Sequence, residues 1–451
     1  MRIILTATVL LLLSSCSTYR TFKTPDISSE NICGENITVQ DTLVDIPSWK
    51  EMFTDQQLQQ LIEKGIKSNT DLQIAHLNIE QAEALLRSSK LAYLPSFAFS
   101  PEGSVSKFNG SKASYTYNLS LTTQWELDIS GRLRNSKEQA RSSVLISQEY
   151  TKMVQTQLIA SITNSYYTLV MLDEQLRITK ESIINQKESL EVITELKSAG
   201  MQTEAAVNQA TADYYNVLAS AKDLEKQIYI VENSIALLIN EAPHTIEHSL
   251  FANTDVLNVE LSNNISLISL ANRPDVREAE YALRNNFYGI NVARAAFYPS
   301  ISLSGSAGWT NNIGAIVNPG NLLSSALGSL TQPIFNRGVN KANFKIAEAQ
   351  YEQSLLSFHK AILIAGNEVN SALTECQSSD EKRMFRQMQV LANKRALENS
   401  MELMKHSSTT YLEVLIAQNS LLQSKLVQVS DWFEGVQGRI NLYKALGGGV
   451  Y

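Results

Sequence analysis

Two stretches of the chain align with each other without a gap, and they decide the fold. Residues 71–96 read DLQIAHLNIEQAEALLRSSKLAYLPS, and residues 275–300 read DVREAEYALRNNFYGINVARAAFYPS. A constant offset aligns Pro95 with Pro299, and later matches follow in the same order along the chain. Each half is about 200 residues, far longer than the repeat of a solenoid protein. The sequence therefore predicts one fold that has been duplicated once.

Each half shows the same order of expected elements, beginning with a helix at 72–93 or 275–297. The proline that follows each helix forces the preceding residue into an extended conformation, so a strand is the natural continuation. Apolar and small polar residues then alternate, as Ile301, Leu303 and Trp309 do with the serines between them, which is typical of strands. The expected strands are Phe97–Lys107 and Tyr115–Leu127 in the first half and Ile301–Thr310 and Leu322–Ile334 in the second.

Helix-breaking residues are scarce, which predicts very long helices after each pair of strands. The 451 residues include only 19 Gly and 9 Pro, about half the average usage. Arg132–Ala199 contains neither residue, and a helix of that length would extend roughly 100 Å. This length disfavours a Rossmann enzyme, a β-sandwich or a TIM barrel. We expect helical hairpins at 132–240 and 338–446, turning near Gly200 and near residues 405–408.

The long helices carry heptad patterns, and the strands carry almost no charge. Apolar residues step by four and three from Val217 to Leu238 and from Leu422 to Tyr443, as in a coiled coil. For the helices alone, a soluble coiled coil is the first interpretation. Neither Asp nor Glu occurs at 103–125 or at 281–347, and uncharged alternating strands suit a membrane barrel. Four strands are too few to close a barrel, so the barrel would have to be shared between chains, and a ring of three copies gives twelve strands.

The N-terminus has the features of a bacterial lipoprotein signal. Arg2 precedes an apolar run, Ile3–Leu13, which is too short to span a bilayer. The run ends in Leu-Ser-Ser-Cys, which resembles a lipobox with Cys16 as the acylated residue. We therefore expect a signal peptide at 1–15, a lipidated tail at 16–48, and structural repeats at 49–250 and 251–451.

The chain resembles the TolC/OprM-type outer-membrane efflux proteins, specifically the lipoprotein branch that serves resistance–nodulation–division pumps. The resemblance covers essentially the whole mature chain and depends on the order of its segments behind the lipobox. These segments are Trp49–Ile62, Asn69–Leu72, Pro95–Ser96, Trp125–Arg132, Arg273–Val276, Gln332–Phe335, Tyr411–Leu415 and Ala445–Gly449.

This resemblance implies a mainly α, internally duplicated TolC-like fold that forms a homotrimer. Long coiled-coil helices would form a periplasmic α-barrel, and four strands per chain would contribute to a twelve-stranded β-barrel in the outer membrane. The implied protein is a passive exit duct for drugs or other small molecules and is not an enzyme. Its implied partners are an inner-membrane transporter and a periplasmic adaptor, with no cofactor. The alternatives are a type I protein exporter, a metal-ion exporter, the periplasmic adaptor of the same pumps, or a structural coiled-coil surface lipoprotein.

The candidate functional residues cluster at the two helical turns. Residues that would contact the adaptor or line a closed tip are Gly200, Lys405, His406, Ser407, Thr409, Thr410 and Tyr411. Because rings of carboxylates restrict pores in this family, Glu402 and Glu413 are the candidates for a constriction. The chain departs from the family pattern at Ser407, where Gly is common, and at Ala206, where Asp is common.

Other chemistry is poorly supported. The net charge of −7 argues against general nucleic-acid binding, and no phosphate-binding G-x-x-x-x-G-K-[ST] motif is present. His244–His248 spells H-x-x-E-H, a metalloprotease string that requires both histidines on one face of a helix. It directly follows Pro243, so we expect a surface loop instead. Cys33 and Cys376 do not form a recognisable disulfide framework.

Overall fold

The computed structural model describes residues 21–25, 38–40, 48–251, 264–266, 270–310, 322–405 and 410–448. The expected signal peptide, Cys16 and Cys33 lie outside these residues, as do His406, Ser407 and Thr409. Two compact units are present. Of the described residues, the strand unit includes 21–25, 76–149 and 277–361, and the helical unit includes 48–75, 150–276 and 362–448. Each unit therefore draws on both halves of the duplicated sequence.

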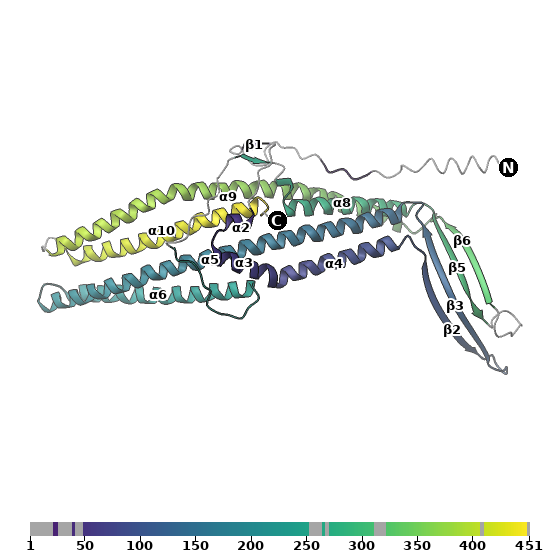
Figure 1. Cartoon of the computed structure of the whole chain (residues 1–451), viewed down its shortest axis with the longest axis horizontal. Helices are drawn as coiled ribbons and strands as arrows, with labels where there is room; N and C mark the ends of the chain where they lie inside the picture. Colours follow the sequence, from purple (N-terminus) through teal and green to yellow (C-terminus); the bar gives the residue numbers. More distant parts are fainter. Residues whose placement is uncertain are drawn as a thin grey trace. The chain divides into compact units, whose positions relative to one another are not determined.

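Long helices and one larger sheet make up most of the structure (Figure 1). The helices are α2 (Trp49–Met52), α3 (Gln56–Ser68), α4 (Thr70–Leu91), α5 (Arg132–Ser198), α6 (Glu204–Leu238), α8 (Pro274–Ala295), α9 (Val339–Lys405) and α10 (Tyr411–Ala445). The strands are β1 (Thr38–Gln40), β2 (Ser96–Ser106), β3 (Ser114–Leu127), β4 (Asn264–Ser266), β5 (Ser300–Thr310) and β6 (Leu322–Thr331).

The four strands expected from the alternating pattern are confirmed as β2, β3, β5 and β6. They form one sheet in the order β2-β3-β5-β6, and every neighbouring pair is antiparallel. Each half contributes one hairpin, and the β3–β5 pairing joins the two halves. β6 ends at Thr331 and not at Ile334 as expected, because Pro333 has no backbone N–H with which to continue a ladder.

The helix-breaking prolines and glycines lie at the junctions between helices and strands. β2 and β5 begin directly after Pro95 and Pro299. Gly131 and Gly338 precede α5 and α9 with φ values of 70° and 77°, a region in which a side chain would be strained. The α5–α6 hairpin turns at Gly200, whose φ is also 77°. The long helices expected within 132–240 and 338–446 are confirmed as α5, α6, α9 and α10, and residues 406–408 of the second expected turn lie outside the described residues.

The helical unit is built around a mixed aromatic and aliphatic core. Tyr166, Phe53 and Tyr443 are among its largest fully buried side chains, and the rings of Phe53 and Tyr443 meet edge to face at 5.4 Å. The buried Tyr166 hydroxyl donates to Asp55 at 2.7 Å and accepts from the backbone N–H of Ser249 at 2.9 Å. This core holds α3, α5 and α10 together.

Polar contacts connect the two helical hairpins along the coiled coil. Gln175 on α5 donates to Ser430 on α10 at 3.0 Å, and Gln418 on α10 donates to Ser189 on α5 at 2.9 Å. No helix in the described part of the chain is both long and apolar enough to cross a membrane.

Candidate functional site

The sheet of the strand unit has one apolar face. Cross-strand partners lie on the same face of a sheet, and the register aligns Phe99 with Leu121 and Leu119 with Trp309. These apolar side chains are exposed to a degree that is unusual for a folded chain. The exposed fractions are 68% for Phe97, 66% for Phe99, 39% for Leu119, 47% for Leu121, 38% for Leu303, 51% for Trp309 and 67% for Leu330.

The opposite face of the sheet is lined mainly by hydroxyl groups. Ser302 and Ser306 pair across the strands with Ser329 and Ser325, at oxygen–oxygen distances of 2.7 and 2.8 Å. A hollow of about 400 Å³ lies over this sheet, and its lining includes Ser304, Thr122 and Gln124. The prediction that Ile301, Leu303 and Trp309 share one face while serines occupy the other is confirmed.

One apolar face and one hydroxyl-lined face are what a sheet needs when lipid lies on one side of it and water on the other. The strands are 10 to 14 residues long, and about 9–11 tilted residues cross a bilayer. The only charged residues in the four strands are Glu102 and Glu126. Glu126 lies near the helical end of β3, and Arg132 at the start of α5 donates to it at 2.8 Å.

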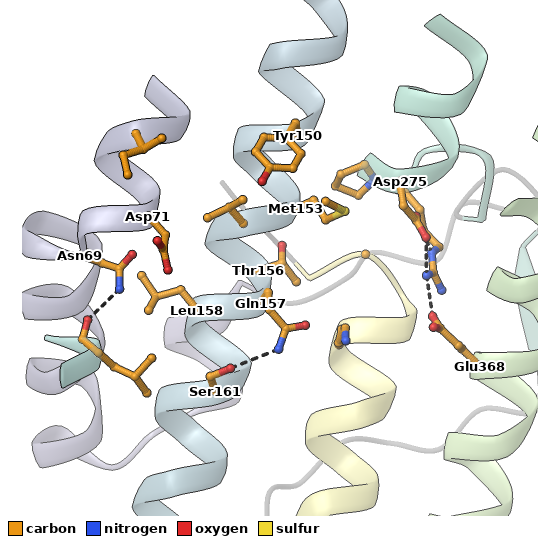
Figure 2. Close-up of a pocket in the computed structure, with 17 residues that line it drawn as sticks. Asn69, Asp71, Tyr150, Met153, Thr156, Gln157, Leu158, Ser161, Asp275 and Glu368 are labelled. Carbon is orange, nitrogen blue, oxygen red and sulfur yellow. Dashed lines mark hydrogen bonds and ion pairs between the residues drawn. The ribbon is translucent and has the colours of Figure 1, made fainter. Parts of the chain in front are cut away.

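A pocket of about 550 Å³ lies in the helical unit, where the first turns of α4 and α8 meet α5, α9 and the end of α10. Figure 2 shows Asn69 and Asp71 on one side, Asp275 and Glu368 on the other, and Thr156 and Gln157 between them. The pocket thus brings together Asp71 and Asp275, the positions that the duplication pairs.

Arg273 is the charged centre of this pocket and is only 4% exposed. Its guanidinium donates to Asp275 at 2.8 Å, to Glu368 at 2.6 Å and to the carbonyl oxygen of Ala445 at 2.6 Å. Burial lowers the pKa of Arg273, but the hydrogen bonds and charges of both carboxylates outweigh it, so the pKa is raised. The network fastens α8, α9 and the end of α10 to one another.

The end of α10 has the geometry needed for this attachment. The helix ends at Ala445, and Gly447 and Gly448 have φ values of 99° and 52°. A side chain at Gly447 would contact Arg273, and one at Gly448 would lie 2.5 Å from Thr156. The two glycines therefore end α10 and let the chain pass close to Arg273 and Thr156.

The candidate residues of the α9–α10 turn lie partly outside the described residues. Lys405 is the last residue of α9, and the exposed Thr410 is at the N-cap of α10. Tyr411 is 2% exposed and packs in a cluster with Ile193, Ala210 and Leu415. Its ring therefore joins the two hairpins near their tips, and a role for these residues in adaptor contact stays a prediction.

The two constriction candidates, Glu402 and Glu413, are exposed residues of α9 and α10 near the same turn. Their role also stays a prediction. His244 and His248 lie in a segment without helical structure, so they lack the shared helical face that the metalloprotease motif requires. His248 lies 3.9 Å from Asp173, and the ring of His244 contacts the Ala242 carbonyl at 2.9 Å.

A family model for outer membrane efflux proteins matches residues 61–241 and 267–448. The chain belongs to the outer membrane efflux protein family. The two matched segments carry one copy of the fold each, as the duplication predicts. Like other outer membrane efflux proteins, this one is a channel of the Gram-negative outer membrane and part of an efflux system, and it is not an enzyme.

Curated relatives cover nearly the whole chain. The cation efflux system protein CusC of Escherichia coli is 28% identical over 404 residues, which cover 89% of this chain and 88% of the relative. The solvent efflux pump outer membrane protein SrpC of Pseudomonas putida is 30% identical over 415 residues, with 90% and 88% covered. A crystal structure of CusC superimposes with a TM-score of 0.86 at 26% identity, covering 96% of this chain and 100% of CusC.

The segment containing Arg273 and Asp275 is one of those that carry the resemblance to outer membrane efflux proteins, but the sequence indicates no role for it. The second carboxylate that Arg273 binds, Glu368, lies 95 residues away in the middle of α9. The signal that could have found the network is the Arg-Pro-Asp string itself, because a charged pair at the start of a core-packed helix needs a partner.

Proposed function

We propose that three copies of this chain close their sheets into one twelve-stranded barrel, which is the outer-membrane segment of a passive exit duct. The observation that carries this proposal is the four-stranded sheet with one apolar face, one hydroxyl face and two outer strands. β2 and β6 are the outer strands. In a bilayer their unpaired backbone groups would cost several kcal/mol each, so they need partners.

The strand directions support closure by further copies. Each neighbouring pair in the order β2-β3-β5-β6 is antiparallel, so β2 and β6 point in opposite directions. When β6 of one copy pairs with β2 of the next, the new pair is again antiparallel, and the alternation continues around the ring. The apolar face would then contact lipid, and the hydroxyl face would line the water-filled lumen.

The helical unit also leaves apolar side chains uncovered in the single chain. On α9, Met384, Phe385 and Met388 are 63%, 68% and 64% exposed. On α6, Tyr215 and Tyr229 are 63% and 60% exposed. Exposed apolar patches such as the one on α9 mark contact surfaces, and a neighbouring copy would cover these side chains in a homotrimer whose helices form the periplasmic tunnel.

The duct would receive its cargo from an inner-membrane resistance–nodulation–division transporter through a periplasmic adaptor. The resemblance to efflux proteins of such pumps supports these partners. The names of the relatives refer to cation and solvent efflux, and drugs or other small molecules are the substrates we propose. A metal-ion or type I protein export system is the alternative for the same duct.

We further propose that residues 1–15 are a removed signal peptide and that Cys16 carries lipid. The lipobox resemblance supports this assignment. One acyl chain binds a membrane only marginally, whereas several acyl chains on one cysteine would anchor the chain firmly. Metabolic labelling with a palmitate analogue should mark the wild type and leave Cys16→Ala unmarked.

Planar bilayer recording tests the duct. We expect purified wild-type protein to form discrete conducting pores, and its Cys16→Ala variant to need detergent for solubility because the apolar sheet face remains. A variant that is soluble and monodisperse without detergent would contradict the duct and favour the coiled-coil surface lipoprotein.

A further inference from the structure

We propose that Glu102 supplies the fixed negative charge that makes the strand-lined part of the lumen prefer cations. This inference rests on the proposed trimeric duct and adds to it a residue that discriminates between permeating ions. The substrate class that it favours is cationic, from simple monovalent ions to compounds that carry a protonated amine.

The register places Glu102 on the hydroxyl face of the sheet. Glu102 pairs with Asn118, which pairs with Thr310 on the next strand. Two residues further along β2, Ser104 shares a hydrogen bond of 2.6 Å with Thr116, and side chains two apart on a strand share a face. The intervening residues of β2, including Pro101, lie on the face that carries Leu119 and Trp309. The Glu102 carboxylate therefore projects to the side that would line the lumen.

Among the residues that the structure describes, Glu102 is also the strand carboxylate without a cationic partner. The other one, Glu126, is bound by Arg132. The residues level with Glu102 on the two neighbouring strands, Asn118 and Thr310, are neutral. The connection between β5 and β6, residues 311–321, contains no charged residue in the sequence.

The basic residues of the β2–β3 connection lie too far along the strand to neutralise this carboxylate. Lys107 is five residues beyond Glu102, roughly 17 Å along an extended strand. That separation is about twice the Debye length at physiological ionic strength. Lys112 lies in the same connection. The negative charge of Glu102 and the positive charges of the lysines therefore lie at different heights along the sheet.

Threefold symmetry would turn Glu102 into a ring of three carboxylates facing one another across water. With the charges on the order of 10 Å from the pore axis, Coulomb attraction in water, screened by 0.1 M salt, gives a roughly fivefold preference for monovalent cations over anions. The preference grows in dilute salt and nearly vanishes at 1 M, where the Debye length is about 3 Å.

Reversal potentials across a planar bilayer measure this preference. We would compare purified full-length wild type, Glu102→Gln, and the double variant Glu102→Gln/Asn118→Asp, with 0.1 M KCl facing 0.01 M KCl. The double variant returns a carboxylate to the same level and face of the lumen on the adjacent strand. We expect Glu102→Gln to lower the potassium-to-chloride permeability ratio several-fold, and the double variant to restore most of it.

The outcomes separate this inference from the proposed function. If wild-type protein forms no pores, the duct itself is wrong and this inference falls with it. If all three proteins form pores of similar conductance but Glu102→Gln leaves the permeability ratio unchanged, the duct stands and the role of Glu102 is refuted. A double variant that conducts but remains as unselective as Glu102→Gln also refutes it, because the level and face of the charge would then not matter.

Discussion

Among the glycines of the sheet, Gly308 leaves the least room for a Cβ atom, and its replacement by alanine tests the pairing that joins the two halves of the chain. It lies on β5, opposite Ser120 on β3. A Cβ atom at this position would lie 2.1 Å from the carbonyl oxygen of Leu119 and 2.7 Å from the Cα of Ser120. Both are backbone atoms, so no side-chain rotation can relieve the overlap.

The cost follows from the distance that the strands must separate. The backbone of β3 has to retreat by roughly 1 Å, because ordinary van der Waals contact needs that much more room. Such a shift weakens about two ladder hydrogen bonds, each worth about 1 kcal/mol net in water and more in lipid. We expect Gly308→Ala to destabilise the sheet by about 3 kcal/mol, a factor of about one hundred in the folding equilibrium.

Gly328→Ala is the matched control. Its Cβ atom would meet only the end of the Leu303 side chain at 3.4 Å, which is ordinary contact. Heat-dependent migration on semi-native gels reports whether the outer-membrane protein remains assembled. We expect Gly308→Ala to lose assembled protein at a clearly lower temperature than the wild type, and Gly328→Ala to behave like the wild type. Equal behaviour of the two variants would refute the proposed β3–β5 register.

Three further predictions concern the helical unit and the N-terminus. Arg273→Met leaves two carboxylates and a helix-end carbonyl without their donor. It should lower the free energy of unfolding by about 2–4 kcal/mol, which circular dichroism would detect as a lower midpoint of thermal unfolding. Arg383→Met, which removes an exposed pair, should cost less than about 1 kcal/mol, and equal shifts would contradict the anchoring role. Burial raises the pKa of the Cys376 thiol to about 11, so only about one thiol in a thousand is ionised at pH 8. In a Cys33→Ser background, Cys376 should therefore resist Ellman's reagent at pH 8 until denaturant is added. Rapid labelling of the native protein would show that the thiol is accessible. Mass spectrometry of the mature protein should show acyl groups on Cys16; a mature chain that begins at Cys16 without any lipid mass would contradict lipidation.

Much of the fold follows from local signals in the sequence. The strands are marked by period-two alternation, and the switches from helix to strand are marked by Pro95 and Pro299. Both signals act within a few residues, so they can be read without any knowledge of tertiary contacts. The duplication strengthens them because each half predicts the other.

Features that depend on distant contacts could not be predicted in this way. The ion pair between Arg273 and Glu368 joins residues that no periodicity connects. The pairing of β3 with β5 requires a register between strands about 190 residues apart, which turn geometry cannot set. The burial of Tyr411 was also hidden, because a tyrosine beside a turn is as compatible with an exposed tip as with a packed one.

The division of the chain into two compact units could not be predicted from the sequence either. The sequence divides the chain into two successive halves, whereas each observed unit combines parts of both. The physical reason is that the strands of one half complete their pairing only with the strands of the other. A repeat boundary in sequence therefore does not have to be a boundary in packing.

Cysteine crosslinking between β2 and β6 tests the closed trimeric barrel most directly. In a Cys33→Ser/Cys376→Ser background, one cysteine replaces Phe97 or Phe99 on β2, and a second replaces Ala326 or Gly328 on β6. Within one sheet these strands are separated by two others, about 14 Å, which exceeds the Cα separation that a disulfide allows. We expect at least one pair to yield covalent trimers after oxidation in intact outer membranes. If every pair gives only monomers, the strands do not meet between copies, and the shared barrel is wrong.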